Sequence, residues 1–394
     1  MVALSLDGRD AHRGDRANLQ TELRNDASSR TSQLVNLLYE LGPDIPEISR
    51  RLGQYKESVR YRYKEKILAK GFAVNASVDN ERLGLKRMIL VLDFSKEFEP
   101  FAESILSVMN ELCYLVSYAK TFLGGFYIVN ESVPTEYVED VRQFFLQMKE
   151  EGMFTKVETL EFDWARQVPM KADCYDFNTG RWDFDLSAES DFRSATYSPS
   201  TPARFDYVDL LILKELQINA DRSLKEISER LDLNYKKLVW HYTTHVVGRR
   251  LIRGYSVNWM GTRYDYKLER ALHRKHSYFA MGLFAKNLST EEVMSLRQKI
   301  DRLPFLWFEA SGKDYFAEFS FPVDHMVEGI EYLSDAIVDL EGRVQVYPIN
   351  QTKAAAFTIP YSLFDLRQKR WVFDGPGLAD RFQQLLVRIK NETR

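Results

Sequence analysis

Basic side chains are concentrated in short segments of a chain that is acidic overall. Between residues 50 and 70 there are eight lysines and arginines and two glutamates, a local charge of +6, whereas the whole chain of 394 residues carries −3. A second segment, from Tyr235 to Arg253, holds five basic residues and no acidic one. Cationic side chains bind phosphate oxygens, and nearby glutamine, tyrosine and arginine donors can reach base edges. These segments therefore predict nucleic-acid binding.

The two basic segments belong to an internal repeat. Residues 47–52 read EISRRL and residues 226–231 read EISERL, and the GFAVN of 71–75 returns as GYSVN at 254–258. An Arg-Trp-x-Phe-Asp element stands at 181–185 and again at 370–374. Each element returns almost half a chain later, whereas the periods of solenoid repeats reach only about 50 residues. The chain is therefore a duplicated domain pair, and two copies of one binding unit suit a ligand that is itself two-fold repeated, such as DNA.

Each basic segment includes the third helix of a predicted three-helix unit. In the first unit, leucines recur at helical spacing between residues 31 and 42, Asp44 and Glu47 form a capping box, and a third helix is expected from Tyr55 to Ala69. The second unit repeats this order, with a capping box at residues 223–226 and a third helix from residue 235 to about residue 247. Alternating apolar residues from 72 to 78 predict a β-hairpin arm. Each unit thus has the outline of a winged helix-turn-helix.

The elements after each unit follow the order βαββαβ, which is the ferredoxin-like arrangement. The expected fold class is α+β, with two copies of a winged helix-turn-helix followed by a ferredoxin-like βαββαβ (ACT-like) domain. Each sheet has more apolar residues than one layer of helices can cover, so we expect the two sheets to pack together as an intramolecular pseudo-dimer. Further homo-oligomers remain compatible with the free outer edges. The expected divisions are a disordered tail (1–30), helix-turn-helix 1 (31–80), ferredoxin-like domain 1 (86–162), an extension and linker (163–204), helix-turn-helix 2 (205–260), ferredoxin-like domain 2 (277–350) and a C-terminal extension (351–394).

The composition narrows the class of protein. Hydrophobic residues make up 45% of the chain, enough for large cores, yet no stretch approaches the roughly 18 consecutive apolar residues of a membrane span. Two cysteines, Cys113 and Cys174, are too few for a disulfide framework. We therefore expect a cytoplasmic protein with no membrane partner.

Ten residues are expected to contact DNA because they lie off the buried stripe of the third helices. When the repeated Tyr-Lys pairs at 55–56 and 235–236 are aligned, the counterparts of Arg60, Tyr61 and Lys64 are Trp240, His241 and Thr244. The second helix should therefore make fewer charge contacts. The ten predicted contacts are Gln54, Lys56, Arg60, Tyr61, Lys64, Tyr235, Lys236, Lys237, Trp240 and His241.

Signals for catalysis or metal binding are weak. His241 and His245 have the i, i+4 spacing of metal ligands, but no carboxylate or cysteine accompanies them at ligand spacing, so no metal site is predicted. The sequence has no glycine-rich phosphate loop, no serine nucleophile elbow and no paired-cysteine motif. We therefore expect no cofactor and no enzymatic activity.

The order of helix-turn-helix, Gly-aromatic-x-Val-Asn arm and βαββαβ domain resembles the Lrp/AsnC (leucine-responsive, feast/famine) transcriptional regulators, here duplicated in tandem. The Ser-Gly-Lys-Asp-Tyr sequence at 311–315 is similar to that family's glycine-aspartate turn, and residues 123–127 form a counterpart without the aspartate. The resemblance implies a transcriptional regulator that binds double-stranded DNA, with an amino acid or another small molecule as effector. It places the effector near Gly312, Asp314 and Gly124.

Two alternatives remain. Siroheme decarboxylases use the same two-domain architecture, but they need a histidine-rich tetrapyrrole cleft. The first βαββαβ segment has no histidine and the second has only His325. A ligand-gated signalling scaffold without DNA binding is the other alternative, and it would leave the charge of the third helices dispensable.

Overall fold

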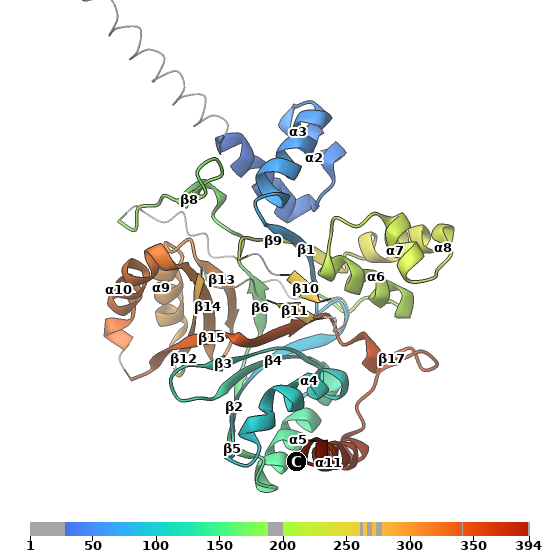
Figure 1. Cartoon of the computed structure of the whole chain (residues 1–394), viewed down its shortest axis with the longest axis vertical. Coiled ribbons are helices and arrows are strands. Elements are labelled where there is room, and N and C mark those ends of the chain that lie inside the picture. Colours follow the sequence, from blue (N-terminus) through green and yellow to red (C-terminus); the bar gives the residue numbers. More distant parts are fainter. Residues whose placement is uncertain are drawn as a thin grey trace, which may run out of the picture.

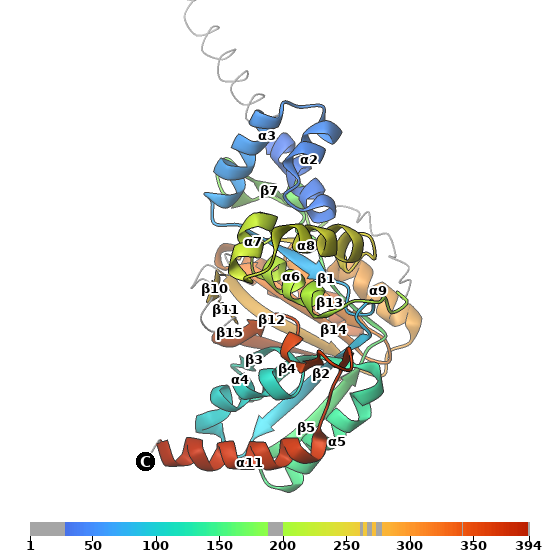
Figure 2. The same cartoon turned by 90° about the vertical axis from the view of Figure 1, so that its right-hand side faces the viewer.

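The computed structural model describes residues 28–187, 200–260, 263–265, 270–272, 278–340 and 342–392. It is an α+β fold in which two three-helix units lie on one side of a large antiparallel sheet (Figures 1 and 2). The expected tail at 1–30 and the linker around 188–199 lie largely outside the described residues.

The three-helix units form where the sequence predicts helices. The first comprises a helix at residues 28–41, α2 (Ile45–Leu52) and α3 (Lys56–Arg62), which continues as a π-helical turn at Tyr63–Leu68. The second comprises α6 (Tyr207–Ile218), α7 (Leu224–Arg230) and α8 (Tyr235–Trp240), followed by a π-helical turn at His241–Val247.

Helix caps fix where these short helices begin. The side chain of Asp44 accepts a hydrogen bond from the backbone N–H of Glu47 at 3.1 Å, but the Glu47 carboxylate turns away to Arg50 and Arg51, so only half of the predicted capping box forms. Ser223 makes the complete box at the start of α7. Such caps satisfy N–H groups that a short helix would otherwise leave unpaired.

The arm after each unit differs from the expected hairpin. Strand β1 (Ala73–Val78) pairs antiparallel with β9 (Ile252–Asn258), the arm of the other unit, with Asn75 opposite Ser256. The two arms have similar sequences and run in opposite directions, so their pairing relates the units by a local pseudo-two-fold. The prediction of a separate hairpin in each copy is wrong, because each arm takes its partner from the other half.

Further contacts lock the two units together. The amide of Asn75 donates to the carbonyls of Gln217 and Ile218 at 2.9 and 3.0 Å. Gly42 has φ of +64° and lies against the ring of Tyr255, so a larger residue would be strained there and would also clash. The spacing of the two units is therefore fixed by packing rather than by a free linker.

The sheet region contains both predicted βαββαβ segments. The first consists of β2 (Leu85–Phe94), α4 (Ala102–Leu112), β3 (Leu115–Thr121), β4 (Tyr127–Pro134), α5 (Val138–Glu150) and β5 (Phe154–Glu161). The second consists of β12 (Tyr278–Ala285), α9 (Thr290–Ile300), β13 (Leu306–Ser311), β14 (Tyr315–Pro322), α10 (Met326–Ile337) and β15 (Val344–Phe357).

The two segments join into one sheet of 11 strands, with the path β5-β2-β4-β3-β15-β12-β14-β13-β6. The far half of β15 pairs with β3, and β6 (Trp164–Gln167), which follows β5, pairs with β13. Each half thus gives an extra strand to the edge of the other. The short strands β10 (Arg263–Asp265) and β11 (Arg270–Leu272) extend the β15 side.

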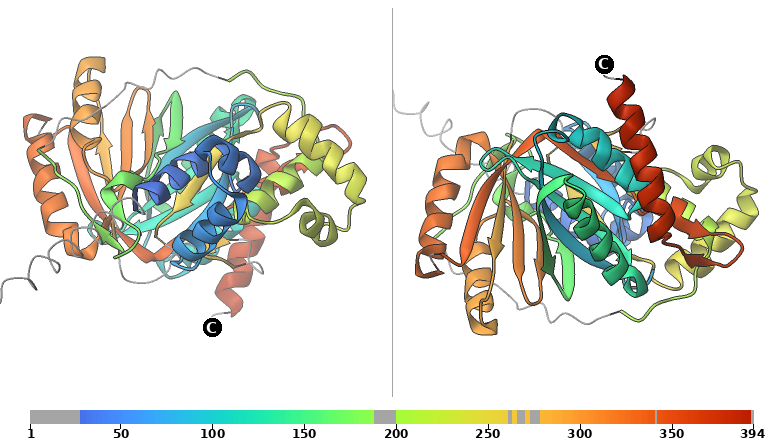
Figure 3. Two further views of the ribbon diagram at one scale, coloured as in Figure 1. Left: turned by 90° about the horizontal axis from the view of Figure 1, so that it is seen from above. Right: turned by 90° about the horizontal axis from the view of Figure 1, so that it is seen from below.

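Apolar side chains from both halves of this sheet meet in a shared core. This core includes Ile89, Val91 and Ile128 from the first half, and Phe284 and Phe316 from the second. The apolar faces that the sequence leaves uncovered by helices are therefore buried against each other. Figure 3 shows the helices of the two halves outside the paired strands.

Each Arg-Trp element packs on the opposite half. Strands β7 (Tyr175–Asp176) and β8 (Arg181–Trp182) form one small hairpin, and β16 (Phe364–Asp365) and β17 (Arg370–Trp371) form the other. Trp182 contacts Phe305 of the second half, while the indole N–H of Trp371 donates to the carbonyl of Leu83 in the first half at 2.8 Å. Helix α11 (Gly375–Glu392) then lies against α5 (Figure 2). The extensions therefore act as reciprocal clamps between the halves.

Candidate functional site

The third helices present most of the predicted DNA contacts to solvent. Eight of the ten are exposed. They are Lys56, Arg60, Tyr61 and Lys64 on the third helix of the first unit, and Tyr235, Lys236, Lys237 and Trp240 on the third helix of the second unit. Gln54 is half-buried and its amide oxygen accepts a hydrogen bond from Arg62 at 2.7 Å. Within the described residues, no ion pair holds the exposed lysines and Arg60. Their charges are therefore available to an anionic partner.

His241 is the exception among the ten. It is only 4% exposed, and its Nδ1 lies 2.9 Å from a carboxylate oxygen of Asp209 on α6. His245 binds the same carboxylate, also at 2.9 Å. The expectation that His241 faces solvent is wrong. No carboxylate stands at ligand spacing from the histidine pair in the sequence, but the fold brings one beside it. Asp209 stands on a different helix, far before His241 in the chain, so sequence spacing alone could not reveal the contact.

The third helices of the two units do not superpose as the alignment of the repeated Tyr-Lys pairs predicts. In the structure, each residue of the first unit matches a residue of the second unit that lies one position earlier than in that alignment. The N-caps are Tyr55 and Asn234, and the buried residues Val59 and Leu238 are equivalent. The second Tyr-Lys pair therefore lies one position further into its helix than the first. The structural counterparts of Arg60, Tyr61 and Lys64 are Val239, Trp240 and Thr243, and the counterpart of His241 is Arg62.

The predicted effector turn has a structural role. Asp314 bonds to Glu161 twice, accepting from its backbone N–H at 3.0 Å and donating to its carbonyl at 3.2 Å. A side chain at Gly312 would come within 2.5 Å of the backbone nitrogen of Asp163. Gly124, at φ of +85°, lies in the corresponding β3–β4 turn. None of the three residues borders the cavity that residues of both halves line.

That cavity has a volume of about 710 Å³ and lies between the β1–β9 arms and the 11-stranded sheet. Its size falls within the usual range of ligand sites. Residues from both halves line it, among them Ser77, Asn130, Ser132, Arg253 and Ser320. The side-chain amide oxygen of Asn130 and the hydroxyls of Ser132 and Ser320 have no protein hydrogen-bond partner, so the lining of the cavity contains polar groups that water or a ligand would have to satisfy.

Two ionisable side chains face this cavity from different halves. Burial lowers the pKa of Arg87 on β2 to about 10 and raises the pKa of Glu318 on β14 to about 7. Desolvation disfavours the charged form of each group, which explains the opposite directions of the shifts. Both side chains keep partial exposure because they border the cavity.

The cavity is not symmetric, although the fold is. Strands β4 and β14 match from their first tyrosine to their last proline, which makes Ser132 equivalent to Ser320 and Asn130 equivalent to Glu318. Arg87 pairs with Ser132, and the equivalent residue beside Ser320 is Ala280. One wall therefore carries a cation and the other an acid. Neither Arg87 nor Glu318 was predicted from the sequence, because each lies in a mainly apolar strand whose few polar residues form no recognisable motif.

Comparisons with known proteins give structural likeness only. No protein-family model matches the sequence, and no curated protein matches it. The fold is similar to a crystal structure of the siroheme decarboxylase NirDL, at a TM-score of 0.48 and 9% identity over 91% of this chain and 99% of that one. A second NirDL structure, in complex with an iron-uroporphyrin III analogue, gives a TM-score of 0.47 and 10% identity over 82% of this chain and 90% of that one. The crystal structure of PH0061 gives a TM-score of 0.26 and 14% identity over 37% of this chain and 93% of that one.

Among the described helices, none has the length and apolar character needed to cross a membrane.

Proposed function

We propose that the chain is a double-stranded-DNA-binding regulator in which two winged helix-turn-helix units act as unequal readers. The observation that carries this proposal is the pair of third helices, held at fixed spacing by the β1–β9 pairing, whose exposed basic side chains form no ion pair with any residue that the structure describes. Helices of this kind insert into the major groove, while lysine and arginine contact the backbone phosphates.

The two readers contribute differently. Lys56, Arg60 and Lys64 give the first helix three exposed cations, whereas Val239 and Thr243 take two of the equivalent positions in the second. Exposed Trp240 gives the second helix an apolar and stacking surface instead. The preferred DNA site should therefore be an imperfect palindrome with unlike halves.

Selection of bound sequences from a random double-stranded DNA pool tests this proposal. We expect enrichment of a two-part site whose halves differ and are separated by about one helical turn, roughly 34 Å. No enrichment over the starting pool would contradict DNA reading. A perfectly symmetric consensus would contradict the inequality of the two readers.

The cavity favours an added ligand function. A small molecule that carries an anionic group would meet Arg87, and a hydrogen-bond donor on the same molecule would meet Glu318 on the other wall. We infer an asymmetric polar effector, larger than a single amino acid, since the cavity holds about 710 Å³.

An enzyme of the siroheme decarboxylase type is the second candidate, and Glu318 is the observation that favours it. A carboxyl group with a pKa of about 7 can give or take a proton at neutral pH. Against it, no histidine borders the cavity in the described part of the chain. An intense visible absorption band that co-purifies with the protein would favour a tetrapyrrole over a colourless effector.

A further inference from the structure

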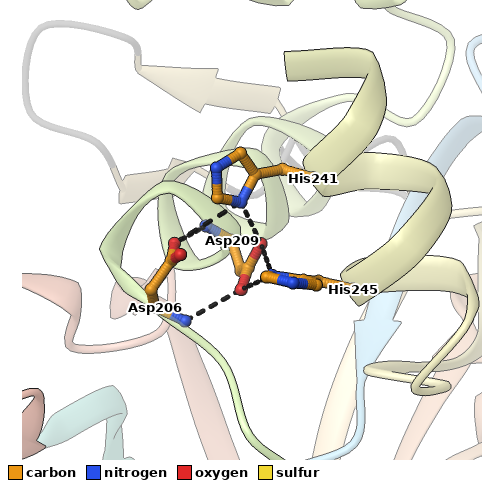
Figure 4. A group of neighbouring side chains, drawn as sticks. All are labelled: Asp206, Asp209, His241 and His245. Carbon is orange, nitrogen blue, oxygen red and sulfur yellow. Dashed lines mark hydrogen bonds and ion pairs between the residues drawn. The ribbon is translucent and has the colours of Figure 1, made fainter. Parts of the chain in front are cut away.

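Four metal-ligating side chains converge in the second three-helix unit, away from the residues that line the cavity. Asp206 and Asp209 stand at the start of α6, while His241 and His245 project from the π-helical turn that continues α8 (Figure 4). One ligand atom from each residue can be chosen so that all four lie within 4.8 Å of one another. The cluster thus connects the first helix of the unit to its third.

The distances between these atoms suit a small tetrahedral ion. The Nδ1 atoms of His241 and His245 lie 2.9 Å from Asp209 oxygens, and that of His241 lies 3.6 Å from Asp206. Zinc binds nitrogen and oxygen ligands at about 2.0–2.1 Å in tetrahedral sites, which separates neighbouring ligands by about 3.3 Å. The observed distances span that separation, so small side-chain movements suffice to admit an ion.

Charge and burial point the same way. Asp209 is fully buried and both histidines are less than 10% exposed, while Asp206 is half-buried. Histidines bind metals in their neutral form, so the two carboxylates would give the ligand set a charge of −2. Within the described residues, no lysine or arginine forms an ion pair with either carboxylate. A buried charge needs a counter-charge, and a divalent cation supplies it.

Hydrogen bonds alone could also hold this cluster. Asp209 caps α6 by accepting from the backbone N–H of Asp206 at 2.8 Å, and it can accept an N–H from each histidine. Asp206 caps the helix through one oxygen, which accepts from Val208 at 2.9 Å. A carboxylate has about four lone-pair sites, so both aspartates can cap the helix and still bind a metal.

We propose that Asp206, Asp209, His241 and His245 form a site for one divalent transition-metal ion, with zinc as the preferred occupant. The set of two nitrogens and two oxygens has no thiolate to select softer ions. Copper exceeds zinc in the affinity order of divalent metals, but Cu²⁺ prefers square-planar sites, whereas zinc takes the tetrahedral geometry that these distances suit. The first unit offers no equivalent, since Arg62 and Lys66 occupy the positions of the two histidines. One ion per chain is therefore expected.

The site also has a regulatory consequence, which rests on the proposed DNA binding. The ring of Trp240 lies against both histidines, with ring centroids 4.9 and 4.7 Å apart, and Lys236 and Lys237 stand on the same helix. An ion that ties this helix to α6 would restrict the reader before it meets DNA. Metal binding should therefore raise the DNA affinity through the second reader.

Titration of the chelator-treated full chain with Co²⁺ tests the site without any DNA. Tetrahedral Co²⁺ gives visible absorption bands, and we expect them to saturate at one ion per chain and to disappear when Zn²⁺ is added. Failure to saturate at one ion per chain would overturn the proposal.

His245→Gln separates the metal site from a hydrogen-bonded cluster, because glutamine still offers an N–H to Asp209 but is a poor ligand. Its Co²⁺ affinity should fall at least about 10–100-fold, the loss that even outer-shell changes cause. Asp206→Asn should also weaken binding while keeping the helix cap, which guards against a variant that fails to fold. Lys66→Gln in the first unit is the matched control and should bind as the unchanged chain does. If both His245→Gln and Asp206→Asn bind Co²⁺ with the affinity of the unchanged chain, the proposal is wrong.

A DNA shift assay with and without one equivalent of Zn²⁺ tests the coupling separately. Tighter DNA binding with Zn²⁺, absent in His245→Gln, supports it, and an unchanged DNA affinity overturns it. Because the Co²⁺ titration involves no DNA, a failure of the proposed DNA binding leaves the test of the metal site intact.

Discussion

Replacing Lys56 and Arg60 with alanine should weaken DNA binding and reduce its salt dependence. Both side chains are exposed on α3, and they stand four residues apart on one face of the helix. Neither packs in the core, so the double variant should fold as the unchanged chain does. Any effect on DNA binding would then report the lost charges.

The magnitude follows from counterion release. Each phosphate contact adds about −0.9 to the slope of log K against log salt concentration, so two lost contacts should flatten the slope by about 1.8. If the two proteins bind equally at about 1 M salt, that slope corresponds to roughly a 60-fold loss of affinity at about 0.1 M. The loss should shrink steadily as salt is raised.

Fluorescence anisotropy of a labelled DNA duplex, measured from about 50 to about 200 mM salt, gives both the slope and the affinity. Lys149→Ala with Lys156→Ala is the matched control, since it removes two exposed lysines from α5 and β5, on the far side of the sheet from the helical units (Figure 1). The control should keep the original slope. If the α3 variant also keeps the original slope, α3 does not contact phosphate, and the proposal that it binds DNA is refuted.

Three further variants probe the cavity and the joined halves. The pKa of Glu318 is raised from 4.5 to about 7 in the folded chain, so between these pH values the folded protein binds a proton that the unfolded chain does not. The free energy of unfolding should therefore fall by up to about 3 kcal/mol as pH rises through this window. Glu318→Gln should remove that part of the pH dependence, which urea unfolding at several pH values measures. Glu309→Gln should destabilise the fold by about 3–5 kcal/mol in the same assay, because buried Arg297, 3.0 Å away, and Arg166 would lose their counter-charge. Trp371→Ala should cost about 3–5 kcal/mol by opening a cavity between the halves, and a cost below about 1 kcal/mol would contradict the clamp role of its hairpin.

Local elements were predictable from the sequence because their signals are local. The strand β12 and the helix α9 follow the predicted βαββαβ order, since apolar alternation and helical spacing act within a few residues. The capping box at Ser223 likewise formed as predicted.

Pairings between distant segments were not predictable in the same way. The alternation in β1 shows that one face is buried, but it does not say which strand lies beside it, and the true partner β9 belongs to the other half of the chain. For the same reason, the sequence did not predict that Asp209 contacts the histidine pair or that Glu318 lines the cavity. Asp209 meets the histidines only when the first and third helices of its unit pack together, and Glu318 meets the cavity only when the two halves close on each other.

Duplication within one chain gives each site of this fold a freedom that two identical chains lack. In a symmetric pair of identical chains, a substitution on one wall appears on the other as well, so Arg87 would always come with a second arginine. Here Ala280 takes the equivalent place, and Glu318 stands where the matching strand has an asparagine. In the same way, the histidine pair of the second unit has basic residues as its counterparts in the first. The retained backbone symmetry fixes the spacing of the two units, while the diverged side chains give each unit its own chemistry. The proposed asymmetric ligand in the cavity, the proposed unlike DNA half-sites and the proposed single metal ion therefore all rest on one physical feature, the joining of two diverged copies in one chain.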